Sequence, residues 1–146
     1  MARQDATLLL DADHNEVIRM FEQYKAARDD SRQQLLAARI CQELEVHMRI
    51  EEEIFYPAYQ QATGDEEVLR DARREHQEAR ALIAQIAAHR RDARLVLALE
   101  DAILHHVNDE RERMFVRARA AKNMDLMRLG GQLQARKAEL TAPHPA

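Results

Sequence analysis

The sequence contains two His-x-x-x-Glu motifs, and their side chains are the ones best suited to binding a metal ion. The first motif runs from His47 to Glu51 and the second from His106 to Glu110. A histidine and a glutamate four residues apart lie on the same face of a helix. Each motif can therefore present one imidazole nitrogen and one carboxylate oxygen to a common point.

A further histidine precedes each motif, so the sequence His…His-x-x-x-Glu occurs in residues 14 to 51 and again in 76 to 110. Two histidines and one carboxylate are a preferred ligand set of non-haem iron(II), with positions left open for a small molecule. Two such sets facing each other predict a centre of two iron ions with an oxo or hydroxo bridge and the two glutamates available as further bridges, manganese being less favoured. The predicted metal ligands are His14, His47, Glu51, His76, His106 and Glu110. The sequence assigns no catalytic residue and no organic cofactor.

An isolated His-x-x-x-Glu pair is more often an exposed ion pair on a helix surface. Here both pairs interrupt apolar stripes, where an unpaired carboxylate would be costly unless a cation bound it. This position favours a metal site, and a metal-free core of His–Glu hydrogen bonds is the alternative. His106 is preferred to His105 because it continues the stripe of Leu99 and Ile103.

Three other kinds of side chain have open roles. His105 is expected to be exposed or to lie behind a ligand. Tyr24, Tyr56 and Tyr59 are expected to pack in the core, and the alternative is that one phenol reaches a metal. The sequence does not decide whether Arg80 points into the site, and Glu43, Glu52 and Glu53 are expected to be solvated.

Four long helical segments must position these residues. Helix start and stop signals place them at about Asp5 to Arg28, Ser31 to Thr63, Asp65 to His89, and Asp92 to Lys122. Pro57 is expected to kink the second segment. A short fifth helix capped by Asn123 and interrupted by Gly130-Gly131 should follow. We thus predict a bundle domain over residues 1–122, and a short helix and disordered tail over 123–146.

The composition agrees with an all-α fold, since the 146 residues include only 3 Gly and 3 Pro. Four segments joined by short turns predict an up-down-up-down antiparallel four-helix bundle. When residues are counted from each turn, His14 lies level with His47, and His76 lies level with His106. The predicted ligands should therefore meet in one layer.

Charge and cysteine content limit the partners and the location. The net charge is −4, with acidic and basic residues interleaved, so no nucleic-acid surface is expected. The single cysteine, no apolar run of membrane-spanning length and no signal sequence predict a cytoplasmic protein without a membrane partner. A monomer or a weak homo-oligomer is expected.

Several of these motifs resemble the hemerythrin-like HHE cation-binding family, over residues from about 8 to 118. The resemblance is carried by Asp13-His14, His47-Met-Arg-Ile-Glu51-Glu-Glu-Ile-Phe-Tyr-Pro57, Glu75-His76 and His106-Val-Asn-Asp-Glu110 followed by Met114-Phe115. The second half is looser, because Val116-Arg117 replaces the usual proline.

The sequence also departs from the oxygen-carrying members that it resembles. Arg80 stands where they have a further histidine, and Arg111 stands where they have an aspartate. The resemblance thus implies the branch with four histidines and two glutamates, and a di-iron protein that binds, senses or reacts with O2, peroxide or NO. Peroxide disproportionation is one implied activity; an iron- or gas-responsive regulatory module without turnover is the alternative.

Overall fold

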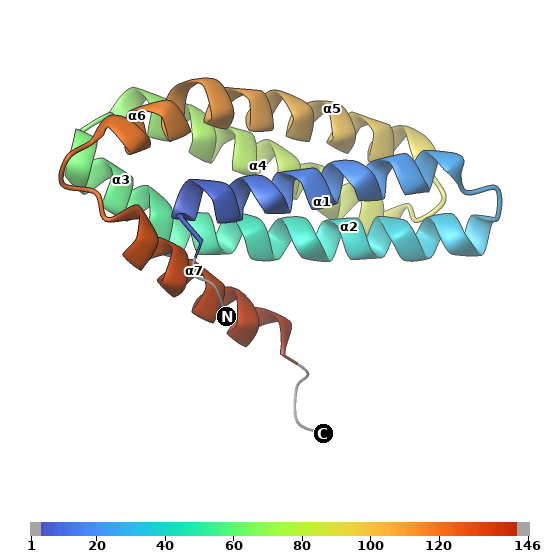
Figure 1. Cartoon of the computed structure of the whole chain (residues 1–146). Coiled ribbons are helices and arrows are strands. Elements are labelled where there is room, and N and C mark those ends of the chain that lie inside the picture. Colours follow the sequence, from blue (N-terminus) through green and yellow to red (C-terminus); the bar gives the residue numbers. More distant parts are fainter. Residues whose placement is uncertain (1–3, 143–146) are drawn as a thin grey trace.

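Four antiparallel helical rods form a bundle, and a fifth helix packs against its side (Figure 1). The computed structural model describes residues 4–142, and that range contains no strand. The predicted all-α bundle is confirmed. The elements are α1 (Ala6–Ala26), α2 (Asp30–Ile50), η1 (Glu51–Phe55), α3 (Tyr56–Thr63), α4 (Glu66–Ala88), α5 (Ala93–Asp109), η2 (Glu110–Met114), α6 (Phe115–Ala120) and α7 (Leu126–Thr141).

The second rod consists of α2, η1 and α3, and the fourth consists of α5, η2 and α6. Helix α1 packs against α2 and α5, and α4 packs against the same two helices from the opposite corner of the bundle. This arrangement is the one expected for short turns between antiparallel neighbours. No helix within residues 4–142 is long and apolar enough to cross a membrane.

Aspartate side chains cap the helix N-termini, because a carboxylate there accepts hydrogen bonds from otherwise unpaired backbone N–H groups. Asp5, Asp65 and Asp92 cap α1, α4 and α5 near the predicted starts. Two predicted caps are wrong. Asp29, not Ser31, caps α2, accepting from the Ser31 backbone N–H at 3.0 Å, and Asp125, not Asn123, caps α7.

A single wide π-helical turn begins at the glutamate of each His-x-x-x-Glu motif. In η1 the backbone N–H of Tyr56 donates to the Glu51 carbonyl, and in η2 that of Phe115 donates to the Glu110 carbonyl. Pro57, which was expected to kink this segment, lies just after the first π turn. Val116 occupies the matching place after the second π turn. Proline is therefore not needed for the distortion, and π turns of this kind often occur at functional sites.

A layer of polar side chains divides the bundle core into two apolar clusters. One cluster, towards α3, α6 and α7, includes Leu10, Phe55 and Phe115. The other, towards the α1–α2 and α4–α5 turns, includes Phe21 and Leu99. Apolar packing above and below the layer excludes bulk water from it, which strengthens every electrostatic interaction inside.

Helix α7 is continuous through Gly130 and Gly131, so the predicted interruption at these glycines is wrong. It packs against α1, α2 and η1 (Figure 1). Gly130 is required for this packing, because a Cβ atom there would lie 1.8 Å from the Gln4 backbone oxygen. Most of the predicted disordered tail, residues 143–146, lies outside the described residues.

Gly130→Ala should therefore loosen α7 from the bundle and lower the free energy of unfolding by about 1–3 kcal/mol, the usual cost of overpacking. Gly131→Ala is the matched control, because nothing lies within 4 Å of a Cβ atom there. Its higher helix propensity should leave stability unchanged or raise it by up to about 1 kcal/mol. Urea denaturation of both variants measures the difference, and equal midpoints would contradict the assigned contact.

Candidate metal centre

The six predicted ligand side chains meet in the polar layer, and all six are buried. Helix α1 supplies one histidine, α4 supplies another, and each of the rods containing a π turn supplies a histidine and a glutamate. Their ligand atoms fall into two groups, each within 4.8 Å. The first group is His14, His47, Glu51 and Glu110, and the second is Glu51, His76 and His106.

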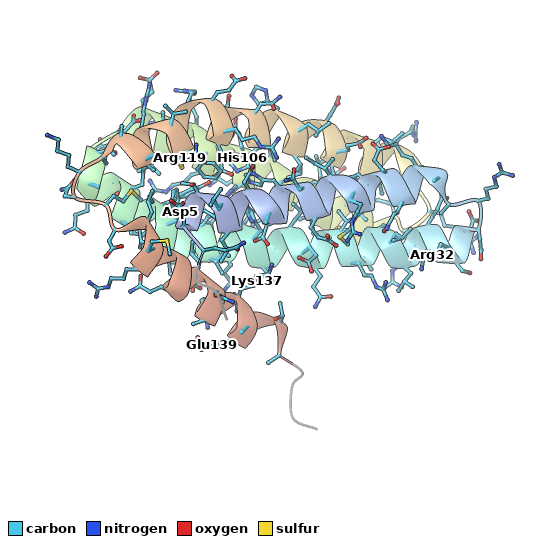
Figure 2. All side chains as sticks on the ribbon, in the orientation of Figure 1. Asp5, Arg32, His106, Arg119, Lys137 and Glu139 are labelled. Carbon is cyan, nitrogen blue, oxygen red and sulfur yellow. The ribbon has the colours of Figure 1, made fainter. Side chains whose placement is uncertain are left out.

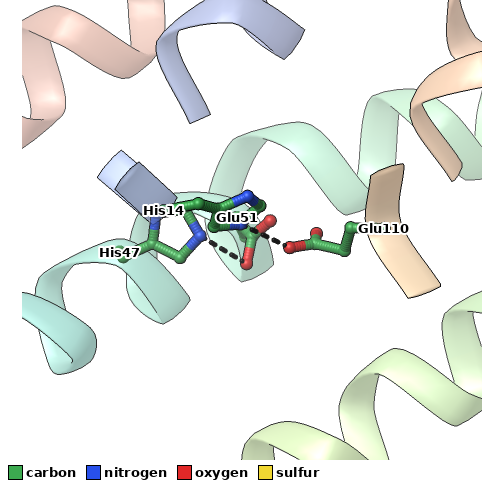
Figure 3. A group of neighbouring side chains, drawn as sticks. All are labelled: His14, His47, Glu51 and Glu110. Carbon is green, nitrogen blue, oxygen red and sulfur yellow. Dashed lines mark hydrogen bonds and ion pairs between the residues drawn. The ribbon is translucent and has the colours of Figure 1, made fainter. Parts of the chain in front are cut away.

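Glu51 connects the two halves of the chain. Its Oε1 atom lies 3.2 Å from His47 Nε2 in the first half and 3.1 Å from His76 Nε2 in the second. Figure 3 shows Glu51 beside His47, with His14 and Glu110 facing the same point. Glu51 therefore belongs to both groups of potential metal ligands.

Glu110 makes the reciprocal connection. Its Oε1 atom lies 3.1 Å from His106 Nε2 and 3.0 Å from His14 Nε2, so it also reaches across to the first half. The sequence predicted one ligand set from each half, facing each other, with the two glutamates available as bridges. In the structure each glutamate does lie between histidines of both halves.

Each of the four histidines turns Nε2 towards the centre and Nδ1 towards a carboxylate outside it. The Nδ1–carboxylate distances are 3.1 Å for His14 to Asp11, 3.0 Å for His47 to Asp13, 2.6 Å for His76 to Glu52 and 2.6 Å for His106 to Glu75. Carboxylates in this position fix the proton on Nδ1 and leave the Nε2 lone pair for a metal ion. Metal-binding histidines commonly have such a carboxylate partner, and here all four histidines, each on a different helix, have one.

A basic side chain lies behind each of these outer carboxylates. The pairs are Arg111 with Asp11, Lys137 with Asp13, Arg80 with Glu52 and His105 with Glu75. Burial opposes ionisation of Glu52, but the hydrogen bonds from His76 and Arg80 outweigh it and lower the Glu52 pKa to about 2. The outer carboxylates are thus held ionised and oriented.

The polar atoms at the centre fit a cation. His76 Nε2 and His106 Nε2 face each other at 3.2 Å, although both rings already use Nδ1 as a donor. Among the described residues, His47 Nε2 and Glu51 Oε2 are buried without a hydrogen-bond partner. Lone pairs that face lone pairs are satisfied only by a proton or a metal ion between them.

The protein itself holds protons at this centre. Burial disfavours a charged His47, but the Glu51 and Asp13 carboxylates outweigh burial and raise the His47 pKa to about 10. Burial also disfavours a charged His106, and Glu110, Glu51 and Glu75 likewise outweigh it and raise its pKa. A metal ion must displace such protons when it binds.

Tyr56 is a site residue that sequence reasoning treated as a core packer. Its Oη atom lies 3.2 Å from Glu110 Oε2, 3.3 Å from Glu51 Oε1 and 3.2 Å from His76 Nε2. Burial and the two glutamates raise the Tyr56 pKa well above its usual value, so the phenol stays protonated. The sequence carries no signal for the π turn of η1, next to which Phe55 and Tyr56 are both fully buried.

The open roles of the other side chains are also clear. Arg80 lies outside the polar layer, where its guanidinium group pairs with Glu52 and Glu45. His105 is exposed, as expected. The expectation that Glu52 is solvated is wrong, because it accepts hydrogen bonds from His76 and Arg80.

The sequence model of the hemerythrin HHE cation-binding domain family matches residues 5–118. The chain belongs to this family. The fold is also similar to that of the hemerythrin HHE cation-binding domain-containing protein from Mycobacterium kansasii, an Rv2633c homolog. That likeness has a TM-score of 0.77 at 19% identity and covers 94% of this chain and 87% of the other. No protein with a curated function matches the sequence.

Proposed function

We propose that this HHE-domain protein binds two iron ions in the polar layer and there binds, senses or reacts with a small oxidant such as O2, peroxide or NO. The observation that carries the proposal is the sharing of Glu51 and Glu110 between the histidines of both halves. The proposed ligands are His14, His47, Glu51, His76, His106 and Glu110. Two histidines and a carboxylate for each ion are a preferred ligand set of non-haem iron(II), which keeps further positions open for a small molecule, whereas structural zinc prefers closed tetrahedral sites and calcium and magnesium prefer oxygen ligands.

Two iron ions would supply a two-electron reservoir for a substrate such as peroxide. The chain supplies the surroundings. Tyr56 presents a protonated phenol to the layer between Glu51 and Glu110, where it can donate a hydrogen bond. Phe115 stacks on the His14 ring with centroids 5.8 Å apart, and Phe55 packs edge-on against Phe115. Because these rings pack closely beside His14, we expect only small molecules to reach the polar layer.

A second candidate is an iron- or gas-responsive module without turnover. The contact that favours it runs from His47 through Asp13 to Lys137 of α7, which is labelled in Figure 2. A change at the centre that moves His47 can therefore reach a helix that packs outside the four rods. In such a module, the presence of metal or gas at the centre would change how α7 packs against the bundle.

Metal analysis tests the proposal directly. Apo protein reconstituted anaerobically with iron(II) and washed with a mild chelator should retain close to two irons per chain. If the activity is peroxide disproportionation, the loaded protein should convert two H2O2 into O2 and two H2O, which an oxygen electrode measures. The control is Glu110→Gln, which keeps the size of the side chain but removes the charge shared by His14 and His106.

Retention of a single zinc ion with no iron uptake would contradict the iron assignment. Two irons without oxygen evolution would favour the regulatory candidate. Its own readout is the protease sensitivity of α7, which should differ between apo and loaded protein.

A further inference from the structure

A second group of potential metal ligands lies on the outer face of the bundle, where α4 meets α5. It consists of Glu75, His105 and Asp109, and one ligand atom from each lies within 4.8 Å of the others. His105 Nε2 is 3.4 Å from Glu75 Oε2 and 3.6 Å from Asp109 Oδ2. None of these three residues is a proposed ligand of the central site.

The spacing repeats that of the central motif, shifted by one residue. His105 and Asp109 are four residues apart, as His106 and Glu110 are, so they form a His-x-x-x-Asp pair on the adjacent face of α5. Residues four apart project in the same direction from a helix. Helix α4 adds a carboxylate from the facing side, as it adds His76 to the central site.

Glu75 provides a second, independent observation that favours a cation at this place. It is only 6% exposed, and its Oε1 atom accepts the hydrogen bond from His106 Nδ1 at 2.6 Å. Its Oε2 atom is buried, faces the His105–Asp109 pair, and accepts no hydrogen bond from any described residue. A buried carboxylate oxygen without a donor costs free energy that a cation in contact with it would remove.

A simple ion pair does not account for the cluster well. His105 is 71% exposed by side chain, and its Nε2 atom lies 3.4 Å from Glu75 Oε2 and 3.6 Å from Asp109 Oδ2, which is longer than a charge-assisted hydrogen bond. The neighbouring Arg113 directs its hydrogen bond at 3.2 Å to Asp71. Glu75 and Asp109 also line a small hollow that extends inward to Glu110, together with the ion-paired Asp71 and Arg113.

We propose that Glu75, His105 and Asp109 form a peripheral site for one divalent first-row transition-metal ion, separate from the central pair. One imidazole nitrogen and two carboxylate oxygens complete three positions of a tetrahedral zinc-type site, and water takes the fourth from the exposed side. Glu75 would serve both sites, through Oε2 at the periphery and through His106 at the centre. This inference holds whichever ion fills the central site.

Zinc is the probe. Iron-loaded, chelator-washed full-length protein is titrated with ZnCl2 by calorimetry, and both metals are then measured after equilibrium dialysis. Wild type should bind one zinc per chain without losing iron. His105→Ala and Asp109→Asn should each lose that zinc and keep the iron of wild type. His89→Ala and Asp101→Asn are matched controls on exposed positions and should bind zinc as wild type does.

Three results would overturn the proposal: no zinc uptake by the wild type, undiminished uptake by His105→Ala and Asp109→Asn, or uptake matched by an equal loss of iron. The third would mean displacement from the centre. Because iron and zinc are counted separately, failure of the central assignment and failure of the peripheral site are distinguishable.

Discussion

His106→Ala should remove most metal from the central site, whereas His105→Ala should leave it there. His106 is 4% exposed, and its Nε2 atom lies 3.1 Å from Glu110 Oε1 and 3.2 Å from His76 Nε2. Loss of a carboxylate behind a ligand commonly costs about 10–100-fold in metal affinity, and loss of the ligand itself should cost more. His105 reaches the centre only indirectly, through Glu75.

Iron per chain after anaerobic reconstitution and a chelator wash measures the difference. Circular dichroism of both apo variants controls for loss of the fold, and the neighbouring position makes the two substitutions closely matched. An iron-free His105→Ala protein beside an iron-loaded His106→Ala protein would show that the adjacent face of α5, which carries His105, holds the metal.

The meeting of these side chains in one layer follows from patterns that are local in the sequence. His47 with Glu51, and His106 with Glu110, are set on one face by helical spacing alone. The depth of His14 and His76 follows from the rise per residue and from short turns. Which glutamate faces which histidine could not be predicted, because the crossover depends on how the two halves pack together.

The outer carboxylates show where sequence reasoning lacks information. Asp11 is three residues before His14, so helical spacing could have indicated that pair. Asp13 pairs with His47 on another helix, and Glu52 pairs with His76 on another helix. No pattern within one helix encodes such contacts.

The π turns and Gly130 were missed for a similar reason. A π turn has no propensity signal, and the proline after η1 has no counterpart after η2. Gly130 was taken as a helix breaker, since glycine costs about 1 kcal/mol in a helix interior. Contact with the Gln4 backbone outweighs this cost, and that contact joins the two ends of the chain.

Metal binding should stabilise the fold, and the stabilisation should grow as pH rises from 5.5 to 7.5. In the metal-free protein the His47 pKa is raised from 6.5 to about 10. A raised pKa stabilises the folded state fully below pH 6.5, and this contribution is lost as pH rises towards 10. The pKa values of Glu52 and Glu75 are lowered from 4.5 to about 2. Their contribution to the stability of the folded state is fully present above pH 4.5 and is lost only as pH falls towards 2. The metal-free protein should therefore be less stable at pH 7.5 than at pH 5.5.

The loaded protein should behave in the opposite sense, because a metal ion on His47 Nε2 replaces a proton. Below the folded pKa each displaced proton weakens apparent metal affinity about tenfold per pH unit, or about a hundredfold between pH 7.5 and 5.5. At ligand concentrations well above the dissociation constant, a hundredfold change corresponds to about 2.7 kcal/mol of stabilisation. For a chain of this size that is a difference of roughly 5–10 °C in Tm.

Thermal melts of apo and iron-loaded protein at both pH values measure this coupling. The gap in Tm between loaded and apo protein should be wide at pH 7.5 and narrow at pH 5.5. His106→Ala is the control, because a protein that cannot retain the metal should show no gap at either pH. Equal gaps at both pH values, with iron bound throughout, would mean that iron does not displace a proton from His47 and is held elsewhere. An apo protein that gained stability between pH 5.5 and 7.5 would contradict the protonated state assigned to His47 instead, which separates the two parts of the argument.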